Sequence, residues 1–359
     1  MAGQTLNTAR VEKKDEFYTK LDDIAKELKF YRPYFKDKVV FCNCDDPYES
    51  NFFKYFALNF NSFGLKKLIA TCYNGSPVQG SELMLDFGDF QNEEPKKIAY
   101  KVEITEVKDY NGDGAINLAD VQYLIQNDKN VLSILKGNGS FDSPECIELL
   151  KESDIVVTNP PFSLFREYLS LLDRYGKKFI IIGNTNAITY KETFKMFQED
   201  KIRTGYTNFN VGMFFQVPDS WKKFHHIENG KKVARVSSSC WYTNMPVEKH
   251  QEELIMYRKY NPIENPHYYN FEAINIQRYT EIPDDYEGIM GVPITFIDKY
   301  NPEQFEILDC CEPAIELEIY KKCSYFTEYK SRQITYKGVL CQKTYHRILI
   351  RRKKSSIKS

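Results

Sequence analysis

One tetrapeptide, Asn159-Pro160-Pro161-Phe162, has the residue types to carry out chemistry on an amino group. The Asn159 side-chain oxygen and the Pro160 carbonyl can each accept a hydrogen bond from a conjugated amine such as adenine N6, drawing its nitrogen toward tetrahedral geometry. A nitrogen localised in this way can attack a sulfonium methyl without a charged base. The two prolines fix φ and remove competing backbone donors, and Phe162 offers a face for a base swung out of a duplex.

The elements around this tetrapeptide place it where an α/β sheet presents its ligands. Residues 154–158 form a short apolar run typical of a buried strand, and residues 163–172 carry apolar side chains at helical spacing. Ligands of open α/β sheets bind at the carboxyl ends of such strands. A plain strand-to-helix turn with proline at the helix start gives the same local pattern, so the tetrapeptide alone leaves both interpretations open.

Similar apolar runs followed by helical patterns predict an α/β fold with a mostly parallel sheet. These runs lie at residues 38–42, 67–71, 154–158 and 178–182. Two aromatic-rich, strand-like runs at residues 210–215 and 234–237 could complete the same sheet. From about residue 262 the chain becomes rich in Tyr, Asn and Pro, which predicts a second, less regular domain.

The composition is that of an ordinary globular protein. With 359 residues, 42% hydrophobic and 28% charged, the chain can bury a substantial core and form one large domain with a smaller appendage. It has no apolar leader and no uninterrupted apolar stretch near the roughly 20 residues of a membrane helix, so we expect a cytoplasmic protein with no membrane partner. The nine cysteines show no zinc-type spacing, so we expect reduced thiols and assign no metal ligands to the site.

Charge is unevenly distributed along the chain. The formal net charge is only -1, yet no acidic residue follows Glu328. The basic residues after it are Lys330, Arg332, Lys337, Lys343, Arg347, Arg351, Arg352, Lys353, Lys354 and Lys358. Such a concentration can neutralise nucleic-acid phosphates, although a solvated basic tail that only aids solubility has the same composition.

Several motifs follow one another along the chain in a recognisable order. They are KDEFYTK (14–20), CNCDDP (42–47) with SNF (50–52), VTNPPF (157–162), IGNTNA (182–187), CWYTN (240–244) and GIMGVPITF (288–296). Through these motifs the chain resembles the EcoRI-type DNA adenine methyltransferase family over nearly its full length. Together they are far more specific than the tetrapeptide.

The resemblance implies both a fold and a reaction. It implies a Rossmann-like class I methyltransferase core over residues 1–250 and a C-terminal target-recognition and DNA-binding region over residues 251–359. The expected cofactor is S-adenosyl-L-methionine and the expected partner is double-stranded DNA, methylated at N6 of a flipped-out adenine for restriction-modification or epigenetic marking. The catalytic residues would be Asn159, Pro160, Pro161 and Phe162.

The resemblance also implies a cofactor pocket at the end of the first strand. Residues there would stand near the amino and carboxylate groups of the methionine moiety, and a helix beginning about Ser50 would favour the carboxylate. An N-terminal motif would close over the cofactor. The implied residues are Phe17, Tyr18, Thr19, Asn43, Asp45 and Asp46. The usual glycine-rich loop is absent here, and without the resemblance this turn is an ordinary acidic loop and Phe17 a core aromatic.

One departure from the family pattern concerns the cofactor's adenine. Where the family is expected to show Gly-Asp-Phe-Arg-Ser, this chain has Gly139-Ser140-Phe141-Asp142-Ser143. The carboxylate that would bind the adenine amino group is therefore missing at Ser140. Either the Ser140 hydroxyl or a shifted Asp142, on either side of Phe141, must serve instead.

A second motif, residues 109–120, fits the calcium-loop template. Asp109, Asn111, Asp113 and Asp120 supply oxygen atoms at suitable spacing, and a glycine stands at the sixth position. The closing residue is Asp rather than Glu, and residues 102–107 have the pattern of a strand instead of a helix. An Asx-rich turn that caps a helix starting near Leu118 is the alternative.

Other functions remain open at the level of sequence. Asn-Pro-Pro-aromatic sites also methylate protein amides and adenine in RNA, and the altered Ser140 would suit an inactive nucleic-acid-binding protein. We expect a monomer, because one flipped base needs one active site. A cognate restriction endonuclease is a candidate partner. Target specificity depends on a few groove contacts, so the amino-acid sequence alone does not identify the DNA sequence that is recognised.

Overall fold

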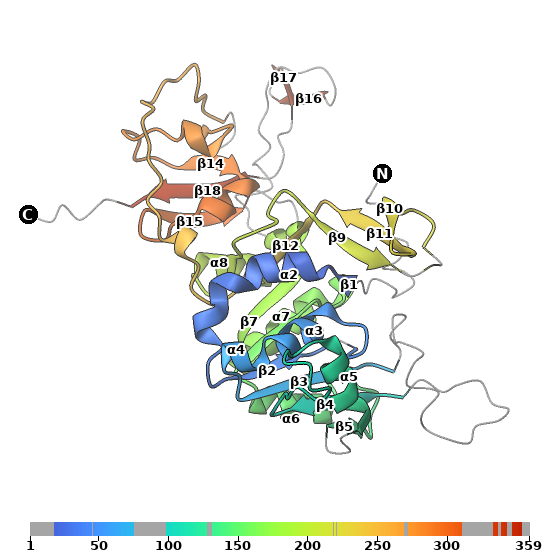
Figure 1. The fold of residues 1–359 in the computed structure, drawn as a ribbon. Helices are drawn as coiled ribbons and strands as arrows, with labels where there is room; N and C mark the ends of the chain where they lie inside the picture. Colours follow the sequence, from blue (N-terminus) through green and yellow to red (C-terminus); the bar gives the residue numbers. More distant parts are fainter. Residues whose placement is uncertain are drawn as a thin grey trace, which may run out of the picture. The chain divides into compact units, whose positions relative to one another are not determined.

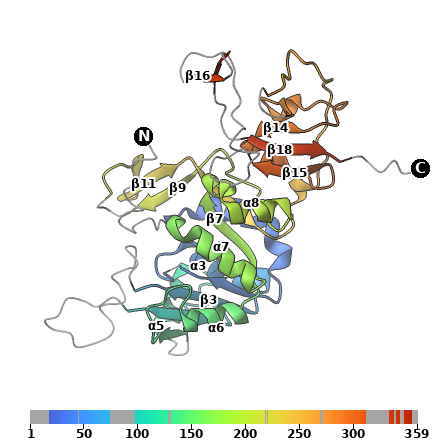
Figure 2. The same cartoon turned by 180° about the vertical axis from the view of Figure 1, so that it is seen from behind.

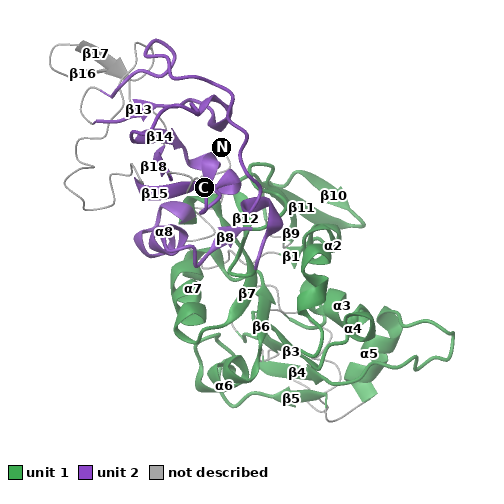
Figure 3. Ribbon diagram, turned by 90° about the vertical axis from the view of Figure 1, so that its left-hand side faces the viewer, with its two compact units in different colours: residues 1–187, 205–245 green, residues 188–204, 246–359 purple. Residues whose placement is uncertain are grey.

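The computed structural model describes residues 18–44, 46–74, 98–127, 131–217, 219, 221–268, 272–310, 333–336, 339–342 and 347–353. The chain divides into two compact units (Figure 3). Unit 1 comprises residues 1–187 and 205–245, and unit 2 comprises residues 188–204 and 246–359. Phe17 and Asp45 lie outside the described residues. No described helix is long and apolar enough to cross a membrane.

Unit 1 contains a large mixed sheet, a smaller antiparallel sheet and the helices that cover them. Its strands are β1 (Tyr18–Thr19), β2 (Val39–Cys42), β3 (Lys67–Cys72), β4 (Tyr100–Ile104), β5 (Leu132–Ile134), β6 (Ile155–Thr158), β7 (Lys178–Asn184), β9 (Met213–Val217), β10 (His226–Glu228), β11 (Lys231–Val236) and β12 (Ser239–Thr243). Its helices are α2 (Leu21–Leu28), η1 (Lys29–Tyr34), α3 (Asn51–Leu58), α4 (Phe60–Phe63), α5 (Leu118–Asn127), α6 (Pro144–Glu152), η3 (Phe162–Leu164) and α7 (Phe165–Arg174), with η4 (Thr185–Thr189) at the boundary.

The large sheet has the strand order β5-β4-β3-β2-β6-β7-β12 within unit 1. Its centre, β3-β2-β6-β7, is parallel, as the continuous apolar runs predict. At the flanks of the sheet β4, β5 and β12 pair antiparallel, so the sheet as a whole is mixed around its parallel centre. The residues of β4 alternate between buried and half-buried, which suits an antiparallel flank better than a strand covered on both faces. Helices α3 and α4 cover one face and α6 and α7 the other (Figures 1 and 2).

The parallel strands create one point where the direction of winding reverses. From β2 the chain crosses through α3 and α4 to β3 on one side, and it returns through α6 to β6 on the other side of β2. The carboxyl ends of β2 and β6 therefore lie side by side with connections that leave in opposite directions. In open α/β sheets this switch point is where ligands bind.

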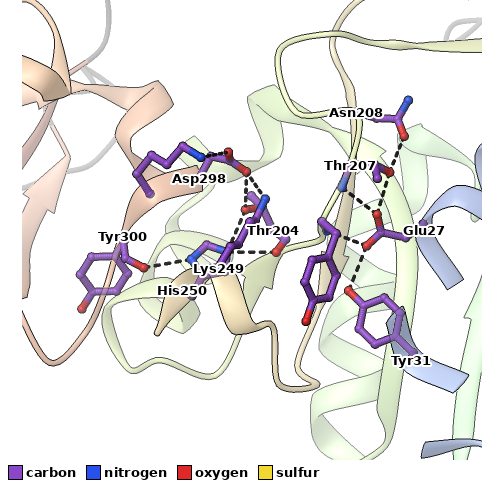
Figure 4. Close-up of polar contacts among 11 residues, drawn as sticks. Glu27, Tyr31, Thr204, Thr207, Asn208, Lys249, His250, Asp298 and Tyr300 are labelled. Atoms are coloured by element: carbon purple, nitrogen blue, oxygen red, sulfur yellow. Dashed lines mark hydrogen bonds and ion pairs between the residues drawn. The ribbon is translucent and has the colours of Figure 1, made fainter. Parts of the chain in front are cut away.

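The aromatic-rich runs after residue 205 form a second sheet instead of completing the first. Its order is β1-β9-β11-β10, and all its pairs are antiparallel. The loop that leads into β9 is held by Glu27 of α2, which is fully buried. Its carboxylate accepts hydrogen bonds from Tyr31 Oη, Tyr206 N, Thr207 N and Thr207 Oγ1 at 2.7–2.9 Å (Figure 4). Burial raises the pKa of Glu27, and these donors oppose the shift.

Unit 2 is built on a four-stranded sheet of order β13-β14-β18-β15. Its elements are α8 (Lys191–Gln198), β8 (Arg203–Thr204), η5 (Glu248–His250), β13 (Ile274–Asn275), η6 (Tyr279–Glu281), β14 (Met290–Pro293), η7 (Ile294–Lys299), β15 (Phe305–Cys310), β16 (Gln333–Tyr336), β17 (Val339–Gln342) and β18 (Arg347–Arg352). Helix α8 packs on β15, where Gln198 Nε2 donates to the carbonyl of Leu308 at 2.7 Å.

A polar cluster within unit 2 joins residues from both of its chain segments. The buried His250 ring lies 2.9 Å from the Tyr300 carbonyl oxygen and 3.2 Å from Thr204 Oγ1 (Figure 4). Asp298 accepts from Thr204 Oγ1 at 3.1 Å and pairs with Lys249 at 2.5 Å. These contacts hold residues 188–204 within unit 2. The expected division at residue 250 had placed these residues in the N-terminal domain.

Three of the C-terminal basic residues take part in the structure of unit 2. Arg351 pairs with Glu306 at 2.5 Å, and Arg347 Nε donates to Asn275 Oδ1 at 3.2 Å. Arg352 donates to the Asp284 carbonyl oxygen. Lys353 is the only other described member of the basic stretch; Lys330, Arg332, Lys337, Lys343, Lys354 and Lys358 lie outside the described residues.

The helix after the tetrapeptide depends on a glycine of the neighbouring strand. Phe165, the first residue of α7, is buried against β7, and a Cβ built on Gly183 would lie 2.4 Å from its ring. The Phe165 ring also contacts Tyr242 of β12, with centroids 5.0 Å apart. Gly183 therefore sets how closely α7 approaches the sheet.

Replacing Gly183 with alanine should lower the free energy of unfolding by about 1–3 kcal/mol, because Phe165 must leave its packed position. Urea denaturation measures this. Gly137→Ala is a matched control, since its Cβ would meet only the end of the Glu145 side chain, at 3.4 Å. Equal stability of the two variants would show that Phe165 has room to move.

Candidate active site

Two asparagines meet at the switch point. Asn43 follows β2 and Asn159 follows β6, and both are buried, with 1% and 8% of their surface exposed. The Thr158 hydroxyl donates a hydrogen bond to the backbone carbonyl of Asn43, which joins the two strand ends. Thr71 Oγ1 donates to Asn43 Oδ1 at 3.1 Å. This hydrogen bond fixes the orientation of the Asn43 side-chain amide. The Asn43 Nδ2 donor is buried and has no hydrogen-bond partner among the described residues.

Asp46 lies beside Asn43 and is held by a tyrosine that the sequence did not single out. Tyr100 of β4 donates its hydroxyl to Asp46 Oδ1 at 2.6 Å, and Tyr48 N donates to the same oxygen at 3.0 Å. Burial raises the pKa of Tyr100, and the charge of Asp46 raises it further, so Tyr100 stays protonated and keeps donating. The Asp46 carboxylate is thus fixed in a largely buried position.

The N-terminal motif approaches the start of α3. Ser50 caps this helix by accepting from Phe52 N at 3.1 Å and Phe53 N at 3.4 Å. Asn51 Nδ2 donates to the backbone carbonyl of Thr19 at 2.8 Å. Thr19 is buried, and its hydroxyl has no hydrogen-bond partner within the described part of the chain. Tyr18 and Thr19 form β1, paired with β9.

The segment that departs from the family pattern lies beside the end of β3. Gly139 has a φ of +75° and sits so close to Cys72 that an added Cβ would be 2.3 Å from the Cys72 carbonyl oxygen. The Ser140 hydroxyl donates to the Asp142 carboxylate, so the two candidate groups act as one hydrogen-bonded pair. Phe141 is buried edge-on against Tyr168, with ring centroids 5.1 Å apart.

The tetrapeptide forms the tight loop after β6 and the first residue of η3. Asn159, Pro160 and Pro161 are buried and Phe162 is half-buried. Leu164 N donates to the Pro161 carbonyl at 2.9 Å, which closes the turn. Phe162 lies edge-on to Phe215 of β9, with centroids 6.3 Å apart. The sequence marked residues 210–215 as an aromatic strand but gave no sign that Phe215 would reach the tetrapeptide.

The calcium-like segment forms an Asx-rich turn before α5. Asp109 accepts from the backbone N–H groups of Gly112, Asp113 and Gly114 at 2.7–3.2 Å. Asp120 accepts from Tyr110 N and Asn117 N at 2.8 and 2.9 Å. The hydrogen bond from Asn117 N is the main cause that lowers the pKa of Asp120. Among the described residues no group of three or more His, Cys, Asp or Glu side chains is arranged to hold a metal ion.

Comparison with known proteins places this chain in a family. A family model described as adenine-specific methyltransferase EcoRI matches residues 5–353. The chain belongs to the EcoRI-type adenine-specific methyltransferase family. Two relatives of this adenine methyltransferase are the Type II methyltransferase M.EcoRI of Escherichia coli, 44% identical over 89% of this chain and 94% of its own length, and M.MpnI of Mycoplasma pneumoniae, 35% identical over 98% and 99%. No solved structure matches.

Tyr100→Phe should raise the dissociation constant for the expected cofactor S-adenosyl-L-methionine about tenfold, because Asp46 loses the donor that fixes it and a hydrogen bond to a charged group contributes about 1.5–3 kcal/mol. Isothermal titration calorimetry measures this. Tyr123→Phe on the exposed face of α5 removes a hydroxyl remote from Asp46 and should bind as the wild type does. Unchanged affinity of Tyr100→Phe would show that the Tyr100 hydroxyl does not hold Asp46 for cofactor binding.

Proposed function

We propose that this adenine methyltransferase transfers a methyl group from S-adenosyl-L-methionine to N6 of an adenine flipped out of duplex DNA. One observation carries the proposal: the Thr158–Asn43 hydrogen bond joins two loops. The loop after β6 carries the amine acceptors of Asn159 and Pro160. The loop after β2 carries the polar groups of Asn43 and Asp46. A methyl donor and an amine acceptor must meet within one site for direct transfer. The switch point brings both sets of groups together.

The residues around Asn43 fit the polar end of the proposed cofactor. Asn43 Nδ2 and Thr19 Oγ1 are buried and lack partners among the described residues, and a buried unsatisfied group costs about 1–3 kcal/mol unless a ligand pairs with it. Asp46 would hold the ammonium group, and the start of α3 would favour the carboxylate. The bound cofactor would supply a methyl group on a positively charged sulfur.

The tetrapeptide would act on the target base by position and electrostatics. Asn159 Oδ1 and the Pro160 carbonyl would accept the two amino hydrogens and localise the nitrogen lone pair, and the surplus proton would pass to solvent. Phe162 would stack on the flipped base. Phe215, edge-on to Phe162, would hold that ring in place.

We assign the missing acidic contact with the cofactor's adenine to Asp142, with Ser140 positioning it through their hydrogen bond. Asp142→Asn should then weaken S-adenosyl-L-methionine binding about tenfold, because a charge-assisted acceptor contributes about 1.5–3 kcal/mol. Ser140→Ala should weaken it less, since the carboxylate remains. Fluorescence titration ranks the two variants, and the reverse order would assign the contact to Ser140.

The remaining parts of the proposal concern DNA and its context. We assign target recognition to residues 251–359 and expect a monomer acting on cytoplasmic DNA. The naming of both relatives as Type II methyltransferases supports a restriction-modification role with a cognate endonuclease. The Asx-rich turn at residues 109–120 has no part in this mechanism.

Asn159→Ala should reduce the methylation rate about 100- to 1,000-fold, the loss seen when one preorganised hydrogen-bonding group is removed from an active site. Wild type and variant would be expressed in a methylation-free host, and N6-methyladenine mapped in genomic DNA at single-base resolution. Asn127→Ala, on the exposed side of α5, is the control.

Methylation confined to one short sequence in the wild type and lost in Asn159→Ala is the expected result. Folded wild type that binds S-adenosyl-L-methionine but leaves DNA unmethylated would redirect the proposal to an RNA or protein substrate. Absence of cofactor binding would indicate an inactive nucleic-acid-binding protein.

A further inference from the structure

We propose that residues 221–236, here named the basic ribbon, bind the phosphate backbone of duplex DNA next to the active site. The proposal rests on the DNA methyltransferase function above and adds a contact surface on unit 1. The basic ribbon comprises a loop, β10, a hairpin turn and β11 (Figure 1). It lies outside the C-terminal region to which sequence assigned DNA binding.

The composition of the basic ribbon suits an anionic partner. It holds five Lys or Arg residues, Lys222, Lys223, Lys231, Lys232 and Arg235, against one acidic residue, Glu228. Glu228 is already paired with Lys20 at 2.8 Å. Within the whole chain Lys plus Arg nearly equals Asp plus Glu, 49 against 50, so this excess is local. A surface of this kind attracts phosphates without reading sequence.

Strand register divides the small sheet into a packed face and an outward face. Phe215 of β9 pairs with Ala234, and both are buried. Phe214 pairs with Arg235, which is exposed, and Lys231 next to the turn is exposed as well. Because side chains alternate along a strand, Phe214, Lys231 and Arg235 share the face opposite Phe215 and Ala234; Val233, between the two basic residues on this face, is buried.

Two lysines of the basic ribbon are committed neither to structure nor to ion pairs. Lys222 and Lys223 are exposed, and neither forms an ion pair with a described residue. Lys232, by contrast, donates to the Asp219 and Trp221 carbonyl oxygens and so shapes the loop that carries Lys222 and Lys223. Lys231 lies 3.6 Å from Glu49, a part-exposed pair of little strength.

The basic ribbon is connected to the catalytic loop through a single strand. β11 pairs with β9, and Phe215 of β9 contacts Phe162. A duplex that delivers an adenine to Phe162 would therefore pass close to this sheet. The arginines of β18, in contrast, already bind Glu306, Asn275 and Asp284 within unit 2.

The decisive variant is Lys222→Gln with Lys223→Gln in the full-length protein. Fluorescence anisotropy would measure the affinity for a duplex without the target sequence between 50 and 200 mM salt. The slope of log K against log salt is negative, and each lost phosphate contact reduces its magnitude by about 0.9, so the slope of the double variant should be about 1.8 less steep, and the variant should bind several-fold more weakly at low salt. Lys222→Arg with Lys223→Arg should restore the wild-type slope.

The control is Lys36→Gln with Lys66→Gln. These exposed lysines lie before β2 and β3, at the opposite ends of the parallel strands from the catalytic loop. They should leave affinity and slope unchanged. If the Lys222/Lys223 variant matches this control, the basic ribbon does not bind DNA. Methylation at saturating DNA tests the proposed function separately: the ribbon variant should retain the wild-type rate there, whereas no DNA methylation by either protein would contradict the proposed function and not the basic ribbon.

Discussion

The structure depends on one hydrogen bond at the centre of the large sheet, from the Thr158 hydroxyl to the backbone carbonyl of Asn43. It joins the ends of β2 and β6 at the point where the winding of the sheet reverses. Asn43 and Asp46, which would contact the cofactor, follow β2, and Asn159 and Pro160, which would contact the target amine, follow β6. Because both ends are buried, neither loop can shift without disturbing the other.

A shell of side chains that perform no chemistry supports this junction. Thr71 orients Asn43, Tyr100 fixes Asp46 and Phe215 holds Phe162. These three lie on β3, β4 and β9, so a purely parallel sheet would not supply them all. The antiparallel flank and the second sheet are therefore part of what makes the site.

Sequence predicted the centre of the fold well because its strands are continuous apolar runs, as at residues 38–42 and 154–158. It did not determine the pairing partners at the edges: alternating strands such as β4 pair antiparallel, and residues 210–215, which could have completed the large sheet, join a separate one. Within the site, motifs brought out Asn43 and Asn159, whereas Tyr100 stands 54 residues from Asp46 with no motif around it.

The allocation of residues 188–204 to unit 2 has a consequence for dissecting the protein. The backbone passes between the units three times, after residues 187, 204 and 245. Ending the chain at residue 250 would therefore leave α8 attached to unit 1 while removing β15, the strand it packs on. Such a fragment would expose an apolar helix face that includes Phe194 and Phe197. A clean separation requires excising the inner segment as well, because a single proteolytic cut after residue 245 would leave residues 188–204 of unit 2 on the same fragment as unit 1.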